Sequence, residues 1–229
     1  MLLPSSGHLV ASRPGGRRRL PVLAVILLAL VPAACTTPQI LATVQVQPLH
    51  LTSEGLRGAS LAFITPSSFT GQEEDKQALA LSFHAVIHEQ RPDLRLVSLP
   101  MALTEVNRAG LAGEYRRMLE DYRLTGLLDR DILRQVGDVT GARYIGQLKL
   151  AGFRQESKDR FGTLGFRIFQ TQSTVVRLFF QIWDSQDGSI VWEGAAEVTL
   201  AQDAIAEKTV TFRSAVEESA RRLVERLPR

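Results

Sequence analysis

The chain has 229 residues, a formal net charge of +3 and a single cysteine. Residues 1–34 hold four arginines and no acidic residue, so the remaining 195 residues carry 23 basic and 24 acidic side chains. A domain without a positive surplus is poorly suited to neutralising phosphates, which argues against nucleic acid as a partner. A single cysteine excludes an intramolecular disulfide, so the fold depends on burial and hydrogen bonds.

The N-terminus has the layout of a bacterial export signal. Three arginines, Arg17–Arg19, precede the short apolar run Leu20–Ala34, which ends in two small residues before Cys35. The position of Cys35 resembles the lipobox of bacterial lipoproteins, in which the cysteine is acylated and the preceding peptide is removed. We therefore expect residues 1–34 to be a lipoprotein signal peptide and Cys35 to be the lipid attachment site, carrying palmitate. Pro32 departs from the lipobox pattern, which prefers leucine at that position.

Two other interpretations of this segment stay open, namely a signal that is cleaved without lipidation and an uncleaved anchor helix. An anchor needs about 20 apolar residues to cross a bilayer, and the run Leu20–Ala34 is shorter and is interrupted by Pro32. In the enteric sorting pattern, an aspartate directly after the lipidated cysteine retains the protein at the inner membrane. Thr36 stands there instead, which predicts the periplasmic face of the outer membrane.

Residues 35–55 are expected to form the lipidated N-terminus and a tether. The first part of this stretch carries no charge, has no helical period and is interrupted by two prolines. The alternative is that the alternating piece Leu41–Val46 adds a strand to a sheet edge. We expect residues 56–229 to form a single globular periplasmic domain.

Apolar runs, helical periodicity and turn residues predict the secondary structure of this domain. The expected elements are a strand at Ser60–Ile64, a helix at Asp75–Glu89, a strand at Leu94–Leu99, helices at Thr104–Arg123 and from Asp129 to Gly141, strands at Arg143–Phe153, Val175–Trp183 and Ser189–Leu200, and a helix at Ala204–Leu227. The first two strands should be parallel across their helical crossover, and the last two should form a hairpin. We therefore predict an α/β (α+β) fold, with helices packed on a mixed, mostly antiparallel sheet of about five strands in the order β-α-β-α-α-β-β-β-α.

Two stretches resemble a known superfamily. One runs from Asp129 through Gly141 into the strand ARYIGQLKLAGF, and the other is the hairpin LFFQIWDSQDGSIVWEGAAE at Leu178–Glu197. Both are similar to the periplasmic lipoprotein superfamily of the curli secretion channel subunit and the outer-membrane activator of penicillin-binding proteins. The order of elements agrees across residues 57–227. The resemblance implies this fold and domains that bind partner proteins or assemble into rings, and it implies no enzymatic activity.

A membrane pore like that of the channel subunit is not expected. Such a pore is built from long inserted hairpins, and the one segment available for it here is Arg154–Thr174. Two spanning strands need about 9–11 residues each, which would leave no residues for the turn. The segment also holds four charged residues close together, at positions 156 and 158–160.

A metal site is also not expected. His84 and His88 have the i, i+4 spacing of a metal-capable pair on the first expected helix, and Glu89 is the one carboxylate nearby. A zinc site needs three or four ligands, so a solvated helix face is the better interpretation.

Four carboxylates flank the expected hairpin and could act as acid–base pairs, namely Asp184, Asp187, Glu193 and Glu197. Asp187 suits the turn, and Glu193 and Glu197 lie on the polar face of one strand, so these residues are better explained by structure. No serine lies in a nucleophile motif and no phosphate-binding loop is present. We therefore expect no catalytic residue, no metal and no cofactor.

One segment is a candidate for binding a partner. Apolar side chains cluster between and around two glycines, directly after a charged stretch, and we predict that they form an exposed flap that docks on a partner. The residues of this predicted flap are Phe161, Leu164, Phe166, Ile168 and Phe169. The alternative is a bulged strand that packs onto the core.

These observations favour a non-enzymatic lipoprotein whose domain binds a periplasmic or outer-membrane protein in cell-envelope assembly or regulation, with self-association as a further possibility. The alternative is a subunit of a ring-forming outer-membrane secretion channel. A hydrolase is a third class, and no constellation of residues in the sequence supports it.

Overall fold

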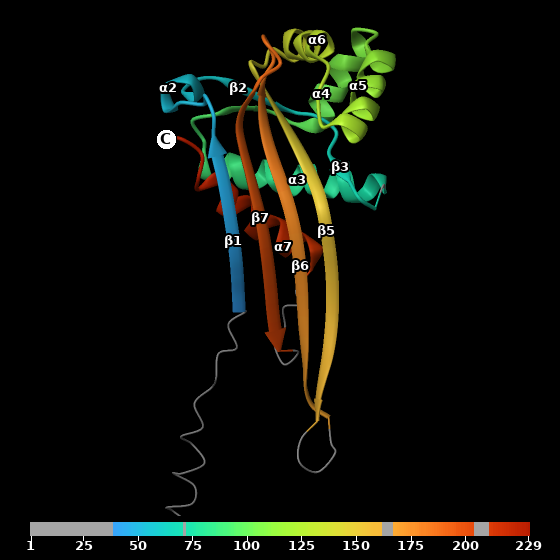
Figure 1. Ribbon diagram of the computed structural model, residues 1–229, viewed down its shortest axis with the longest axis vertical. Helices are drawn as coiled ribbons and strands as arrows, with labels where there is room; N and C mark the ends of the chain where they lie inside the picture. The colour runs from blue at the N-terminus through green and yellow to red at the C-terminus, as the bar shows by residue number, and fades with distance from the viewer. Residues whose placement is uncertain (1–38, 71, 162–166, 204–210) are drawn as a thin grey trace, which may run out of the picture. The chain divides into compact units, whose positions relative to one another are not determined.

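A computed structural model describes residues 39–70, 72–161, 167–203 and 211–229, without the side chains of 157–161, 167–171 and 202–203. Figure 1 shows the elements, which are β1 Gln39–Pro48, α2 Ser53–Leu56, β2 Ser60–Phe63, β3 Ser67–Ser68, α3 Glu73–Gln90, β4 Arg95–Val97, α4 Leu99–Arg108, α5 Ala112–Thr125, α6 Arg130–Thr140, β5 Tyr144–Phe161, β6 Arg167–Asp184, β7 Ile190–Asp203 and α7 Phe212–Val224. In these parts of the chain, no helix has the length and apolarity that crossing a membrane requires.

The described strands form one seven-stranded mixed sheet in the order β1-β7-β6-β5-β2-β4, and β3 pairs with β5. The four long strands β1, β7, β6 and β5 are antiparallel neighbours, whereas β2 pairs in parallel with β4 and β5. The predicted fold class, the parallel crossover through α3 and the β6–β7 hairpin are therefore confirmed. The sheet has two more strands than expected, because β1 and β3 are not among the predicted elements.

Strand β1 corrects the expected extent of the tether. It pairs with β7 over its whole length, and its half-buried residues Ala42, Val44 and Val46 pack against the core. The alternating stretch is thus an edge strand, which is the alternative interpretation of the sequence. The sheet includes the chain from Gln39 onward, so the folded part does not begin at residue 56.

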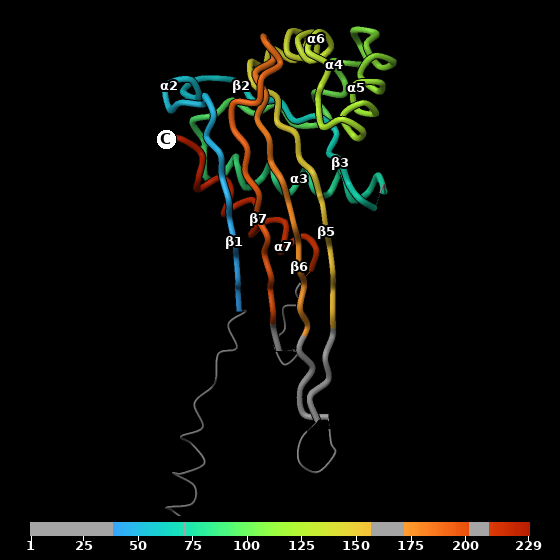
Figure 2. The backbone as a smooth tube through the Cα atoms, in the orientation of Figure 1, coloured from blue at the N-terminus to red at the C-terminus, as the bar shows by residue number. Residues whose placement is uncertain are grey.

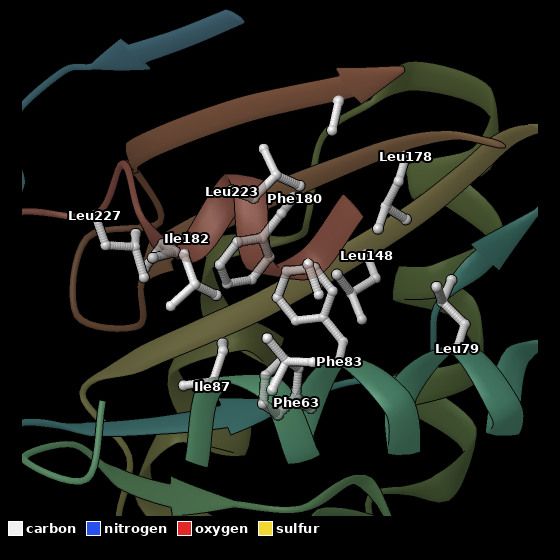
Figure 3. Close-up of a cluster of buried hydrophobic side chains, with 14 of the residues drawn as sticks. Phe63, Leu79, Phe83, Ile87, Leu148, Leu178, Phe180, Ile182, Leu223 and Leu227 are labelled. Atoms are coloured by element: carbon white, nitrogen blue, oxygen red, sulfur yellow. The ribbon is translucent and has the colours of Figure 1, made fainter. Parts of the chain in front are cut away.

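The larger core lies between the sheet and helices α3 and α7. Its centre is aromatic: the ring of Phe180 on β6 lies 4.8 Å from that of Phe83 on α3, 5.6 Å from Trp192 and 6.3 Å from Phe63. Figure 3 shows Phe180 and Phe83 among aliphatic side chains from the strands and both helices. All four aromatic side chains are fully buried, and Leu223 of α7 belongs to the same core, so α3 and α7 pack on the same face of the sheet.

A second core covers one end of the opposite face. Ile145 and Trp183, which follow the larger core's Tyr144 and Ile182 by one residue, point to the other side and pack beneath α4, α5 and α6. The sheet is thus covered by α3 and α7 on one face and by α4, α5 and α6 at one end of the other face.

The predicted helix Thr104–Arg123 is wrong in its bounds and its continuity. Helix α4 begins at Leu99 with Pro100 in its first turn, where proline's missing N–H costs nothing. The chain then breaks at Gly110, which has a φ of 75°, and α5 begins at Ala112. Two helices replace one because glycine can take the left-handed conformation that this turn requires.

The ends of the last two helices show how local residues set boundaries. Helix α6 is capped as predicted: Asp129 accepts hydrogen bonds from the N–H groups of Asp131 and Ile132, both at 3.0 Å, and Gly141 has a φ of 63°. The predicted helix at Ala204–Leu227 is described only from Phe212, where Thr211 has extended backbone and forms a capping box.

Candidate partner-binding surface

The four long strands present one side that none of the described helices covers beyond the end occupied by α4, α5 and α6. Side chains alternate along each strand, so the residues between the buried core positions point away from α3 and α7. We call these side chains the open face; they are Leu41, Thr43, Gln45, Lys149, Arg154, Val175, Arg177, Phe179, Ala195, Glu197 and Thr199. Figure 2 shows the four strands running side by side in front of α3 and α7.

The centre of the open face is apolar and its surroundings are charged. Phe179 is half-buried, and its partners in register are Lys149 on β5 and Ala195 on β7. One row away, Arg177 Nη2 lies 2.6 Å from Glu197 Oε2, which joins β6 to β7. Both side chains are exposed, so this pair contributes about 1 kcal/mol or less. An aromatic centre within a polar rim is the composition of many protein–protein interfaces.

A hollow of about 310 Å³ lies at the β5 side of the open face. Gly152, just after an irregularity in the β5 register, opens it, and Phe69 at the end of β3 stands beside it with 57% of its surface exposed. Arg154 and Arg177 are also at its wall. This hollow can accept one apolar side chain of a partner.

Strand β1 is an edge of the sheet with no protection by charge. Its sequence, QILATVQVQP, has no charged residue, and within the described part of the chain it pairs with β7 alone. Exposed edges normally carry lysine or other charges that oppose pairing with another strand. An uncharged edge of this length is therefore a surface onto which a partner strand can add.

The structure leaves the predicted lipid site and flap largely untested. Cys35 and residues 1–34 lie outside the described residues, as do Leu164 and Phe166. Phe161 is the last residue of β5, and Ile168 and Phe169 belong to β6, but their side chains are outside the description. The backbone of β5 and β6 is paired up to Phe161 and Arg167, the last described residues on each side, and a partner-binding role for the flap stays a prediction.

The histidine pair on α3 is held by packing. The rings of His84 and His88 stack with centroids 6.2 Å apart, and His84 also meets Phe63 edge-on at 6.0 Å. Burial lowers the pKa of His84, and the neighbouring His88 lowers it further. Among the residues with described positions, no three His, Cys, Asp or Glu side chains gather as a metal site would require.

The carboxylates of the β6–β7 hairpin serve the turn and the sheet. Asp184 is buried and accepts hydrogen bonds from the Arg143 guanidinium and the Gln186 N–H. Hydrogen bonding from Ser189 holds the pKa of Asp187 below its ordinary range. Glu197 is exposed on the open face, as the sequence predicts. Glu193 accepts a hydrogen bond from the Gln181 side chain, which joins β7 to β6.

The tyrosines provide a test of the packing around the sheet. Burial raises the pKa of all three, Tyr115, Tyr122 and Tyr144, above the ordinary value of 10.0, and that of Tyr122 reaches about 12, with Glu193 adding to its shift. At pH 10.0, ultraviolet absorbance of the folded protein should therefore show far less than half of its tyrosine as tyrosinate.

The sign of the pH effect follows from these directions. The unfolded chain loses its phenolic protons first, so the tyrosines leave stability unchanged below pH 10 and reduce it as the pH rises toward 12. The same titration in denaturant is the control and should show ordinary ionisation near pH 10. Half-ionisation at pH 10 in the folded protein would contradict the described burial.

No family model and no curated protein matches this sequence. Several solved structures resemble the fold. A PelC dodecamer from Paraburkholderia phytofirmans is 13% identical, with a TM-score of 0.42, covering 82% of this chain and 99% of that one. Lipoprotein GNA1162 from Neisseria meningitidis is 13% identical, with a TM-score of 0.41 and coverages of 73% and 96%. The LpoB C-terminal domain from Salmonella enterica is 14% identical, with a TM-score of 0.34 and coverages of 62% and 82%. These likenesses concern the arrangement of elements, and membership of the superfamily expected from the sequence stays a prediction.

Proposed function

We propose that this chain is a lipid-anchored lipoprotein at the periplasmic face of the outer membrane, and that its domain binds a protein partner in cell-envelope assembly or regulation without catalysing a reaction. The open face is the observation that carries the binding role, because an aromatic centre in a polar rim lies on a side that no described helix covers. The export signal and the position of Cys35 support the anchor.

The partner meets a rigid surface. The open face is built on four paired strands rather than on loops, so its side chains are held in a fixed register. The hollow beside Phe69 offers an anchor point, and the uncharged edge of β1 offers backbone hydrogen bonds. These features suit a folded protein partner with its own exposed strand or apolar side chain.

The alternative function is a subunit of a ring-forming secretion channel, and the sheet edges favour it. Strand β1 ends the antiparallel part of the sheet on one side, and beyond Gly152 the described part of β5 pairs only with β6 on the other. The alternation of directions makes β1 antiparallel to β5, so β5 of one copy can pair with β1 of the next. Such a head-to-tail contact closes into a ring or continues as a filament.

A crosslinking experiment in cells tests the proposed surface. A photo-crosslinking amino acid at Phe179 should capture an envelope protein, because that position lies at the centre of the open face. The same amino acid at Glu89, which is exposed on α3 behind the sheet, is the matched control and should capture much less. Equal capture from both positions would contradict the proposal, and capture of a second copy in a large detergent-extracted particle would favour the ring.

The same cells test the anchor. Labelled palmitate should be incorporated into the parent protein and not into a Cys35→Ser variant. That variant should no longer be found in the membrane fraction. An unlabelled parent whose fractionation matches that of Cys35→Ser would remove the lipid anchor from the proposal while leaving the crosslinking result valid.

A further inference from the structure

A cavity of about 420 Å³ lies next to the open face, at the end covered by α5, and is bounded by α5, the segment that follows β2, the start of α3 and strand β5. Its walls are largely apolar, with Pro66, Leu103 and Leu119 among them, and the two buried tyrosines of α5 also line it. This volume is within the range of small-ligand sites and is large enough for a few residues of peptide.

The inner wall of this cavity includes an amide that lacks partners. Gln147 on β5 is only 1% exposed, and neither its Oε1 nor its Nε2 has a hydrogen bond to any described residue. The neighbouring polar groups do have partners. The Tyr115 hydroxyl accepts a hydrogen bond from the Thr65 backbone N–H, with 2.8 Å between nitrogen and oxygen. The Tyr122 hydroxyl donates a hydrogen bond to Gln181 Oε1 at 2.9 Å. A buried amide without partners costs stability, whereas leucine in its place would not.

We propose that this cavity binds an extended peptide segment of a partner protein, with one peptide residue pairing with both amide atoms of Gln147. In an extended strand, the N–H and C=O of one residue point to the same side, so they can donate to Oε1 and accept from Nε2 together. The single trans amide of an acetylated sugar points its N–H and C=O in opposite directions, so it reaches only one of these atoms.

The charges at the mouth of the cavity indicate an acidic peptide. Lys76 is engaged with Glu73 at 3.1 Å, and Arg116 with Glu120 at 3.2 Å. Arg123 also lines the cavity, and it forms no ion pair with any residue whose side chain is described. Its guanidinium can therefore receive a carboxylate of the bound segment through two parallel hydrogen bonds.

This inference rests on the proposed function in one respect, which is that a partner protein supplies the peptide. It places a second contact on the same face of the sheet, where Gln147 pairs in register with Gln181, two residues along β6 from Phe179. A partner that docks a folded part on the open face can insert an extended segment here, which would bind the two parts of one protein more tightly than either contact alone.

The test uses the full chain in detergent and a phage-displayed library of random peptides as the probe. Selection should enrich peptides that carry Asp or Glu. A selected peptide, made synthetically, should bind Gln147→Leu about tenfold more weakly or worse, since two hydrogen bonds are lost. It should bind Gln45→Leu, the matched change on the open face, as it binds the parent. N-methylation of the pairing peptide residue should also abolish binding.

The stability of Gln147→Leu separates a binding role from a structural one. The binding role predicts a thermal unfolding midpoint equal to or above that of the parent, because the variant removes an unpaired buried amide. Arg123→Ala, an exposed change on α5, is the second variant and should remove the preference for acidic peptides without altering folding.

A lowered midpoint in Gln147→Leu, or peptide binding that is unaffected by both variants, would overturn the inference. Failure of the two proposals can be told apart. Crosslinks from Phe179 without peptide binding would leave the proposed function standing, and peptide binding without crosslinks would leave the cavity site standing.

Discussion

Replacing Phe180 by alanine should lower the free energy of unfolding by about 3–5 kcal/mol. Phe180 is fully buried, and its ring meets those of Phe83, Trp192 and Phe63 within 6.3 Å. The variant leaves a cavity that neither the sheet nor α3 can close, because both are fixed by other contacts. Since domains of this size are stable by about 5–15 kcal/mol, the loss is a large share of the total. Urea unfolding followed by tryptophan fluorescence measures it.

The adjacent residue is the control for this prediction. Phe179 is the same residue type on the same strand, but it points to the open face and is only half-buried. Phe179→Ala should therefore cost about 1 kcal/mol or less. The same variant should weaken capture of a partner if the proposed function holds. Similar losses of stability from both variants would mean that a further layer covers the open face, and the proposed surface would then be wrong.

Gly137→Ala should destabilise the fold by about 1–3 kcal/mol, although alanine is the better helix former. Gly137 lies in α6 against the β6–β7 turn, and an added Cβ would clash with the Ser185 side chain and lie 3.0 Å from the Ala142 carbonyl oxygen. Ser185 is fully buried and donates a hydrogen bond to that same carbonyl, so it cannot easily move aside. Thermal unfolding of the purified chain measures the effect.

Gly113→Ala is the matched control, because this glycine also lies in a helix but an added Cβ would meet nothing within 4 Å. The expected result is no loss of stability and a gain of up to about 1 kcal/mol. If both variants proved stabilising, α6 would be free to shift away from the turn, and the close packing of α6 against Ser185 would be incorrect.

Several features follow from the sequence because they depend on residues close together in the chain. The cap at Asp129 and the left-handed Gly141 bound one helix, and the alternation in β6 and β7 produces a hairpin around the turn at Asp187. The same alternation correctly divides Glu197 from the buried positions on its strand. Turn residues and period-two patterns act through neighbouring residues, so the sequence alone predicts the structures that they form.

Other features depend on partners that are distant in the sequence. The sequence of Leu41–Val46 favours an extended tether and leaves a strand as the alternative, and only its pairing with β7 shows that it is a strand. The break at Gly110 is likewise undecided by periodicity, because a glycine near a helix start can weaken a helix or divide it. In both cases the local preference is too small to select one outcome, and long-range contacts select it.

The candidate sites show the same division. By itself the sequence determined the alternation that separates Phe179 from Phe180 and the helix caps, since each is a property of neighbouring residues, whereas the export signal stays a prediction. Only the tertiary structure decided that the Phe179 side is open while the Phe180 side is covered, and that Gln147 lies buried at a cavity wall with no hydrogen-bond partner among the described residues. Burial depends on which helices pack on which face of the sheet, and no local pattern in the chain specifies that arrangement.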